Sequence, residues 1–346
     1  MYKNKNVLLI AGGGTLGTHT AKELLRLGCS VDIICPEEKK SYDERLKFYQ
    51  TYATDDFLKD LLAKKHYDGI VNFIHYDDAE DYKPVHKLLA DKTEQLIFVS
   101  SYRVYADLQH PITEEAPRLL DVSTDEEFLA KEDYALSKAR AEDFIRNESG
   151  TRNWTIIRPV ISFSEKRLDI VTIGQRNVVV SGKTGRTVFL PQAAKNVTAG
   201  LDWAGNSGKL IANLMFKKEA LGETFTISTA PNLTWGEVAQ IYTELTGVKF
   251  EWMDTDEWLN DPDCVKNGYC RAASEDGRTG EEIGLSKIIP EEITGYYWAA
   301  VYDRFFDRRI DCSKVLRVTG LAKEDFLSIK EGIKTELSKI DMEEIK

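Results

Sequence analysis

Short apolar runs alternate with amphipathic segments between Val7 and Ile157. The runs are short and rich in β-branched residues, whereas the segments between them place apolar residues three or four positions apart. We therefore expect buried strands at the runs and helices between them. The expected strands cover residues 7–10, 30–35, 48–51, 70–74, 95–99 and 155–157, and the expected helices cover residues 18–27, 55–65, 85–92 and 125–147.

This alternation predicts an α/β fold, a doubly wound parallel Rossmann sheet with helices on both faces, because each helix returns the chain to the same edge of the sheet. Ligands of such sheets collect at the carboxyl ends of the strands. Gly12–Gly17, Ile74-His75 and Ser100-Ser101 each follow an expected strand. We expect these three segments to meet at one rim of the sheet.

The alternation weakens after Pro159. Later segments still carry local signals, among them a helix that opens with Thr234 as a plausible N-cap. We expect strands at residues 178–180, 187–190 and 223–228, and helices at residues 197–217, 234–247 and 326–340. The organisation we infer is a Rossmann dinucleotide-binding domain over residues 1–161, rejoined by parts of about 197–230 and 304–320, with residues 162–346 mainly a smaller substrate-binding domain.

Composition narrows the class of protein. The chain has 346 residues, a formal net charge of -11 and a pI of about 5.2, which argue against a broad nucleic-acid footprint. No apolar run approaches the length of a membrane span, and the first apolar run lacks a signal-peptide cleavage pattern. We therefore expect a cytoplasmic protein that does not engage a membrane.

The cysteines give no sign of a disulfide framework or a metal site. Their number is five, which is odd, and no C-x-x-C pair occurs. We expect free thiols and no bound metal.

The segment from Asn6 to Gly17 has the pattern of a nucleotide-binding turn. An apolar strand leads into Gly12, Gly14 and Gly17, which have G-x-G-x-x-G spacing and enclose Thr15-Leu16, and a helical pattern follows from Thr18. A pyrophosphate needs backbone N–H groups at a helix N-terminus and no Cβ in its path. A plain tight turn between strand and helix is the alternative.

The end of the second expected strand leaves the choice of dinucleotide open. An acidic residue often stands there to hold the ribose hydroxyls, but Cys35 occupies the position. Glu37 could replace that acid, or Lys39 and Lys40 could meet a 2′-phosphate. A solvated charged loop explains the same residues.

Ser100-Ser101 and the pair Tyr134 and Lys138 carry the candidate chemistry. Tyr134 and Lys138 are four residues apart, so they share one face of the expected helix. A tyrosine pKa near 10 is too high for a base at neutral pH, and a neighbouring ammonium lowers it. Such a set moves a hydroxyl proton while a hydride passes to or from a nicotinamide. A chance surface pair is the alternative for any Tyr-x-x-x-Lys.

These motifs resemble those of the extended short-chain dehydrogenases/reductases, in the NAD-dependent epimerase/dehydratase family. FVSSYRVYAD is similar to the family's strand-five motif, and YALSKARAED to its Y-x-x-S-K helix. The resemblance implies Ser101, Tyr134 and Lys138 as catalytic residues, and IIRP implies that Pro159 lies beside the nicotinamide. ALGETFTIS, LTWGEVAQI and YDRFFDRRIDCSK resemble an atypical branch that includes chloroplast stem-loop-binding proteins.

The resemblance also implies a binding site for NAD or NADP. The residues it assigns to cofactor binding are Gly12, Gly14, Thr15, Leu16, Gly17, Cys35, Ile74, His75, Ser100, Tyr134, Lys138 and Pro159. Five features depart from the family pattern. Tyr52 stands where an adenine-binding aspartate is common, and VISFSEKR lacks the glycine-proline that often follows the sixth strand. Ala11 replaces the first glycine, Cys35 the ribose-binding acid, and Ile74-His75 a usual pair of small residues.

The resemblance leaves more than one reaction open. Tyr102 and Arg103 stand where dehydratases of the family carry an Asp-Glu pair, which disfavours a dehydratase. We expect an epimerase acting on a sugar or nucleotide sugar. An NADP(H)-dependent carbonyl reductase is the alternative, and a nucleic-acid-binding protein on the same fold is the alternative from another class. The sequence does not determine the oligomeric state, and a homodimer is one possibility.

Overall fold

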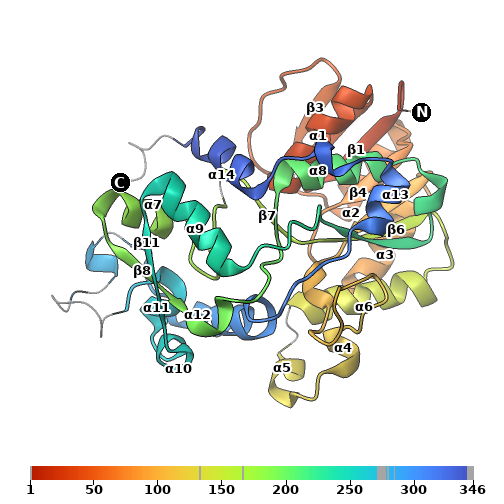
Figure 1. Cartoon of the computed structure of the whole chain (residues 1–346). Helices are drawn as coiled ribbons and strands as arrows, with labels where there is room; N and C mark the ends of the chain where they lie inside the picture. Colours follow the sequence, from red (N-terminus) through yellow and green to blue (C-terminus); the bar gives the residue numbers. More distant parts are fainter. Residues whose placement is uncertain are drawn as a thin grey trace. The chain divides into compact units, whose positions relative to one another are not determined.

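The computed structural model describes residues 2–131, 134–165, 167–270, 278, 280–283 and 285–340 (Figure 1). The chain divides into two compact units. The first unit comprises Met1–Ser162, Ala204–Ala230 and Ile310–Phe326, and the second comprises Phe163–Trp203, Pro231–Arg309 and Leu327–Lys346. Each unit is described here by itself.

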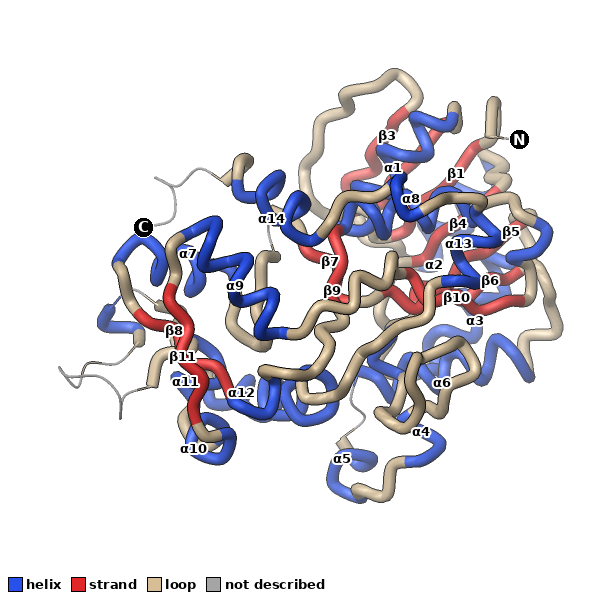
Figure 2. The backbone as a smooth tube through the Cα atoms, viewed as in Figure 1, coloured by secondary structure: helices blue, strands red, loops and turns tan. Residues whose placement is uncertain are grey.

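A parallel sheet of seven strands forms the centre of the first unit, and its strands are red in Figure 2. The strands are β1 (Asn6–Ile10), β2 (Ser30–Cys35), β3 (Leu46–Gln50), β4 (Gly69–Asn72), β5 (Gln95–Val99), β6 (Trp154–Pro159) and β10 (Glu223–Ile227). Their order is β10-β6-β5-β4-β1-β2-β3, and every pairing is parallel. The winding direction reverses between β1 and β4, where sheets of this kind bind their ligands. The expected Rossmann sheet is confirmed.

Alternate residues of the strands serve two separate cores. Val7 and Leu9 of β1 face one side, with α1 (Thr15–Leu27), α8 (Ala204–Leu214) and α13 (Ser313–Thr319). Leu8 and Ile10 face the other side, with α2 (Asp55–Lys64), α3 (Ala79–Ala90) and α6 (Tyr134–Asn147). A strand that is buried on both faces needs apolar residues at consecutive positions. These strands therefore appear in the sequence as the short apolar runs from which they were predicted.

Capping residues set the helix starts and correct one boundary. Thr54 accepts a hydrogen bond from Phe57 N and begins α2. Asp78 accepts one from Glu80 N, so α3 begins at Ala79 and not near Val85 as the apolar pattern indicated. A side-chain cap satisfies the free backbone N–H groups of the first helical turn and so determines where the helix begins. The spacing of apolar residues carries no information about this position.

The second unit contains a small parallel pair of strands surrounded by helices. The strands are β8 (Thr187–Pro191) and β11 (Lys249–Met253), and the helices are α7 (Gln175–Thr184), α9 (Trp235–Thr246), α10 (Thr255–Leu259), α11 (Pro262–Asn267), α12 (Pro290–Ala299) and α14 (Ile329–Leu337). Thr234 caps α9 through a reciprocal pair of hydrogen bonds with Glu237, as expected. The chain leaves the first unit through β7 (Ile161–Phe163) and returns to it through β9 (Leu201–Trp203).

Two expectations for this region were wrong. Residues 178–180 lie within α7, because Gly174 and the left-handed Gly185 (φ 68°) define helix ends on either side of the three valines. Residues 197–217 are helical only over α8, since β9 precedes it. Among the helices that the structure describes, none has both the length and the apolar character that a membrane crossing requires.

The expectation of free thiols was wrong for Cys264 and Cys270, which the structure joins in a disulfide. Helix α11 ends at Gly268, whose φ of 65° turns the chain back on itself. That turn brings the two Cα atoms to 4.7 Å, a separation typical of disulfides. Cys29, Cys35 and Cys312 are free and buried.

Candidate active site

The glycine turn joins β1 to α1, with Gly14 as the N-cap of the helix. A Cβ on Gly17 would collide with the backbone of Gly12, and a Cβ on Gly12 would lie 2.6 Å from Leu9 Cβ. A Cβ on Gly14 would meet nothing within 4 Å. Gly12 and Gly17 are therefore required by packing, whereas Gly14 borders open space at a helix N-terminus, the environment that a pyrophosphate needs.

Ala11 precedes this turn in a backbone conformation that favours glycine. Its φ is 54°, in the left-handed region. An alanine there costs roughly 1 kcal/mol relative to glycine. Ala11 therefore replaces the glycine of the family pattern but keeps the left-handed backbone conformation that a glycine would adopt.

Two charged side chains come back to the turn from the loop after β2. Lys39 Nζ donates a hydrogen bond to Gly13 O, and a Cβ on Gly13 would lie 3.1 Å from Glu37 Oε2. The same Cβ would lie 2.6 Å from Cys35 Cβ, so Cys35 packs directly on the turn. Burial raises the pKa of the Cys35 thiol. Both a carboxylate and an ammonium thus lie beside the glycine turn.

Lys138 is held at the carboxyl ends of two strands. Its side chain is only 2% exposed, and Nζ donates to Val99 O at 2.7 Å and to Ile74 O at 3.2 Å. Burial lowers the pKa of Lys138 to about 7, although the negative charge of Glu142 acts in the opposite direction. The ends of β4 and β5 therefore fix this ammonium at the rim that the sequence indicated.

Tyr134 is the first residue of α6 and not, as expected, part of the middle of a longer helix. The structure divides the expected helix into α5 (Glu126–Ala130) and α6, and residues 132 and 133 lie outside the described part of the chain. Lys138 Nζ lies 5.7 Å from the centroid of the Tyr134 ring. The two side chains thus share one face of α6, as their spacing predicted.

Two further side chains contact the Tyr134 ring. The His75 ring lies with its centroid 4.6 Å from that of Tyr134, and the Arg103 guanidinium carbon lies 5.4 Å from the Tyr134 centroid. His75 was assigned to the site on the family resemblance, whereas Arg103 was not assigned to it. Its position two residues after Ser101, close to the end of a strand, is the sequence feature that could have indicated Arg103 as a site residue.

Ser101 is carried to this place by a single helical turn. Its Oγ accepts a hydrogen bond from Arg103 N at 3.2 Å and so begins η1 (Tyr102–Val104), which packs against α6. Ser100 N donates to Ile157 O at 2.8 Å, which ties the segment to β6. Ser101 and Tyr134 therefore belong to two elements in direct contact.

The remaining assigned residues lie at the carboxyl ends of strands of the same sheet. Pro159 ends β6, which pairs with β5. The glycine turn follows β1, and Ile10 O at the end of β1 accepts a hydrogen bond from Phe73 N. Strands β5 and β4 lie between β6 and β1, so Pro159 and the glycine turn lie along the same carboxyl edge of the sheet.

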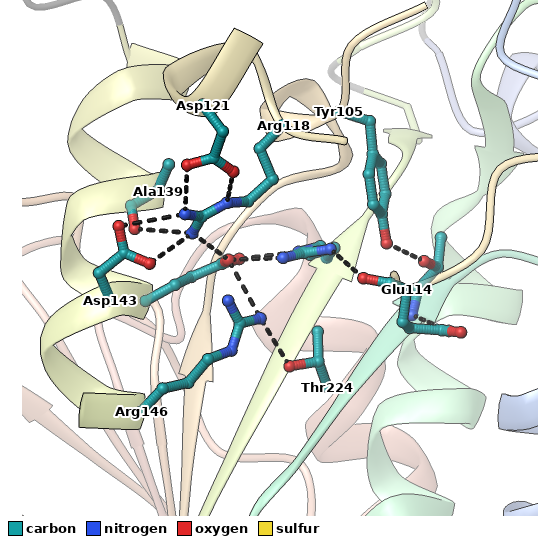
Figure 3. Close-up of polar contacts among 11 residues, drawn as sticks. Tyr105, Glu114, Arg118, Asp121, Ala139, Asp143, Arg146 and Thr224 are labelled. Carbon is teal, nitrogen blue, oxygen red and sulfur yellow. Dashed lines mark hydrogen bonds and ion pairs between the residues drawn. The ribbon is translucent and has the colours of Figure 1, made fainter. Parts of the chain in front are cut away.

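A buried ion network supports α6 one turn beyond Lys138 (Figure 3). Glu142 is 0% exposed and accepts two hydrogen bonds from Arg158, at 2.8 and 2.6 Å. Arg118 and Arg146 lie 3.5 and 3.3 Å from the same carboxylate. Burial opposes ionisation of Glu142, but Arg158 outweighs it and lowers the pKa of the carboxyl.

The same arginines line a pocket of about 470 Å³. Arg118 also pairs with Asp121 and Asp143, at 2.8 Å each. Because carboxylates neutralise these guanidinium groups, we assign the network to the positioning of α6 and not to ligand binding.

Comparisons with known proteins agree with this architecture. Residues 2–105 match a family described as "Putative NAD(P)-binding", and residues 83–195 match one described as "Male sterility protein". UDP-glucose 4-epimerase of Lacticaseibacillus casei is 35% identical over 71 residues, which are 19% of this chain and 22% of that protein. The sequence likeness to this epimerase therefore covers a minor part of both proteins.

Solved structures share the fold over the whole chain. Epimerase Mth375 from Methanothermobacter thermautotrophicus has a TM-score of 0.65 at 14% identity and covers 99% of this chain and 95% of its own. WbmG of Bordetella bronchiseptica, solved in complex with NAD, has a TM-score of 0.63 at 15% identity, covering 99% and 96%. At such identities the likeness concerns the fold.

The sheet, the glycine turn and the sequence matches define an NAD(P)-binding Rossmann protein. Within this class, the matched families and the structural neighbours agree with the resemblance to the extended short-chain dehydrogenases/reductases, which is confirmed at the level of fold and cofactor class. The match of residues 2–105 to an NAD(P)-binding family agrees with the expected cofactor, NAD or NADP.

Proposed function

We propose that the protein is an NAD(P)-dependent epimerase that acts on a hydroxyl of a sugar or nucleotide sugar, with residues 162–346 mainly forming the substrate-binding part. One observation carries the proposal. Tyr134, with Lys138 on the same helix and Ser101 on a contacting element, lies at the carboxyl edge of the sheet that also carries the glycine turn. The sequence likeness to a UDP-glucose 4-epimerase supports a nucleotide sugar as the substrate class.

The residues present fit a nicotinamide dinucleotide. Gly14 borders open space that a Cβ would fill, and it caps the N-terminus of α1. The turn from Gly12 to Gly17 would hold the pyrophosphate, and Cys35, Glu37 and Lys39 would face the adenosine ribose. When bound, the nicotinamide supplies reversible hydride transfer.

In the proposed mechanism Tyr134 removes the proton of the substrate hydroxyl and later returns it. Ser101 Oγ orients the substrate oxygen by a hydrogen bond. Lys138, one turn from Tyr134, favours the phenolate when it is charged and fixes the position of the helix through Val99 O and Ile74 O. Inversion at the substrate carbon would require the bound substrate to present its other face to the nicotinamide while Tyr134 and Ser101 keep their contacts with the oxygen.

A binding experiment tests the cofactor part of the proposal. Calorimetric titration with NAD, NADH, NADP and NADPH should show binding of at least one dinucleotide to the natural protein. Gly14→Val should abolish it, because the new side chain enters the open space at the helix N-terminus. Gly174→Val is the matched control, since Gly174 also caps a helix and also has nothing within 4 Å of its Cβ position.

A second measurement separates the epimerase from the reductase. Protein purified without added cofactor should retain a nicotinamide, detected by its absorbance after denaturation, and should interconvert UDP-glucose and UDP-galactose or a related pair. Protein that is empty and oxidises NADPH stoichiometrically with a carbonyl substrate would instead be a reductase. Absence of binding to all four dinucleotides would contradict both functions.

A further inference from the structure

We propose that Arg103 is the permanent cation that stabilises the phenolate of Tyr134, so that this arginine, and not Lys138 alone, makes the tyrosine an effective base. The inference rests on the proposed function, because it concerns the proton carrier of that reaction. Arg103 acts through Tyr134 and is therefore a positioning residue.

The geometry places the guanidinium within cation–π range of the phenol. The Arg103 guanidinium carbon lies 5.4 Å from the ring centroid, closer than Lys138 Nζ at 5.7 Å. A cation within about 6 Å of an aromatic ring is attracted to it, and the attraction increases when the ring carries a full negative charge.

Lys138 is poorly placed to supply that charge by itself. Its ammonium donates to two backbone carbonyls, Val99 O and Ile74 O, which hold it at the strand ends. Burial also lowers its pKa to about 7, so that it loses its charge in the range where a tyrosine base must work. A guanidinium stays protonated at every relevant pH.

The local fold delivers Arg103 to the ring together with the substrate-orienting serine. Arg103 N donates to Ser101 Oγ, and the resulting turn η1 packs against α6. One short segment therefore fixes both the hydroxyl of Ser101 and the charge of Arg103 relative to Tyr134.

Titratable or charged side chains from different elements contact the Tyr134 ring. Arg103 comes from η1, Lys138 from α6, and His75 from the segment after β4. His75 Nε2 lies 3.0 Å from Asp77 Oδ1, so a protonated His75 is partly neutralised. Arg103 supplies the guanidinium of this group.

The expected effect follows from the distance. At 5.4 Å, a unit positive charge lowers the phenol pKa by roughly 0.5 to 2 units, for effective dielectric constants of about 80 and 20. Arg103→Met should therefore raise the Tyr134 pKa by that amount. Arg103→Lys should restore most of the shift, since it keeps a cation on a side chain of similar length.

The test is an NMR titration of protein labelled with ¹³C at the tyrosine ζ carbons, without cofactor or substrate. Tyr134→Phe identifies the resonance of Tyr134. Arg152→Met is the matched control, because it removes an exposed arginine from the same unit. The proposal predicts a raised Tyr134 pKa in Arg103→Met, a value close to the natural one in Arg103→Lys, and no change in Arg152→Met.

An unchanged Tyr134 pKa in folded Arg103→Met, or in Arg103→Gln if the methionine variant does not fold, would overturn the proposal. Because this titration needs no cofactor, it is independent of whether the protein is an epimerase. Where activity is measurable, the pH at which kcat/KM rises should move to higher pH by the same amount as the phenol pKa, which a purely structural role of Arg103 does not predict.

Discussion

The buried carboxylate of Glu142 offers the sharpest test of how the candidate site is supported. Glu142→Gln keeps the size and shape of the side chain but removes its charge. The change leaves Arg158, 1% exposed, without its anionic partner, and it also removes a carboxylate that lies 3.5 Å from Arg118 and 3.3 Å from Arg146. The free energy of unfolding should fall as a direct consequence.

The size of the effect follows from burial. Both partners are almost fully buried, and the pair has two hydrogen bonds, at 2.8 and 2.6 Å. Breaking such a pair by removing one charge typically costs about 3–5 kcal/mol, because the remaining charge stays buried without compensation. Asp121→Asn is the matched control, since Asp121 is about half exposed and loss of a surface pair costs roughly 0–1 kcal/mol.

Urea unfolding measured by circular dichroism, with hydrogen exchange of α6 read by mass spectrometry, provides the assay. The double variant Glu142→Gln with Arg158→Met should cost less than the sum of the two single variants, because it removes both charges. A cost below about 1 kcal/mol for Glu142→Gln, or strict additivity in the double variant, would refute the reasoning.

The effect of Glu142→Gln on the free energy of unfolding should depend on pH. The folded state lowers the pKa of Glu142, so its contribution to stability is present above the pKa of the unfolded chain, near 4.5, and is lost as the pH falls through the lower folded value. The stability difference between the natural protein and Glu142→Gln should therefore shrink in acid. A difference that stays constant from pH 7 to pH 3 would contradict the assigned ionisation.

Three further outcomes are expected. Tyr134→Phe should reduce turnover by about 10²–10⁴-fold with unchanged folding, because it removes only the phenol oxygen. Full activity in this variant would mean that the chemistry does not use Tyr134. Gly14→Val should lose dinucleotide binding by calorimetry while Gly174→Val keeps it. Alkylation of unfolded, unreduced protein should modify Cys29, Cys35 and Cys312 but not Cys264 or Cys270, and mass spectrometry that finds five modified cysteines would contradict the disulfide.

The sheet of the first unit could be predicted because its strands are buried on both faces. Such strands must be apolar at consecutive positions, as in Val7 to Ile10, so their pattern is clear in sequence. The glycine turn was visible for a related reason. Gly12 and Gly17 stand at positions where any Cβ would collide, so packing dictates the residue type.

Two other features, the helix around the valines at 178–180 and the disulfide, could not be predicted from the spacing of apolar residues. The valines at 178–180 have strand propensity, but Gly174 and Gly185 define a helix around them. The pairing of Cys264 with Cys270 depends on the left-handed Gly268 between them. Neither feature follows from spacing alone, since each depends on the backbone path of neighbouring residues.

Arg103 shows which contacts of the candidate site could not be predicted from the sequence. The spacing of Tyr134 and Lys138 predicts one helix face, since the helix period is fixed. The approach of Arg103 to the Tyr134 ring depends on how η1 packs against α6, which is a tertiary contact. Sequence patterns report contacts within one element far better than contacts between elements.

The division of the first unit among three chain segments has a consequence for biosynthesis. During translation the outer edge of β6 stays unpaired until Glu223–Ile227 is made, and the apolar face of α1 waits for Ala204–Leu214. Val315 of α13 joins the same core later still. At about 5–20 residues per second, the emerging Rossmann half exposes an open strand edge and apolar surface for many seconds. Chaperone binding to the nascent chain, and aggregation of chains truncated before α13, follow from this order of assembly.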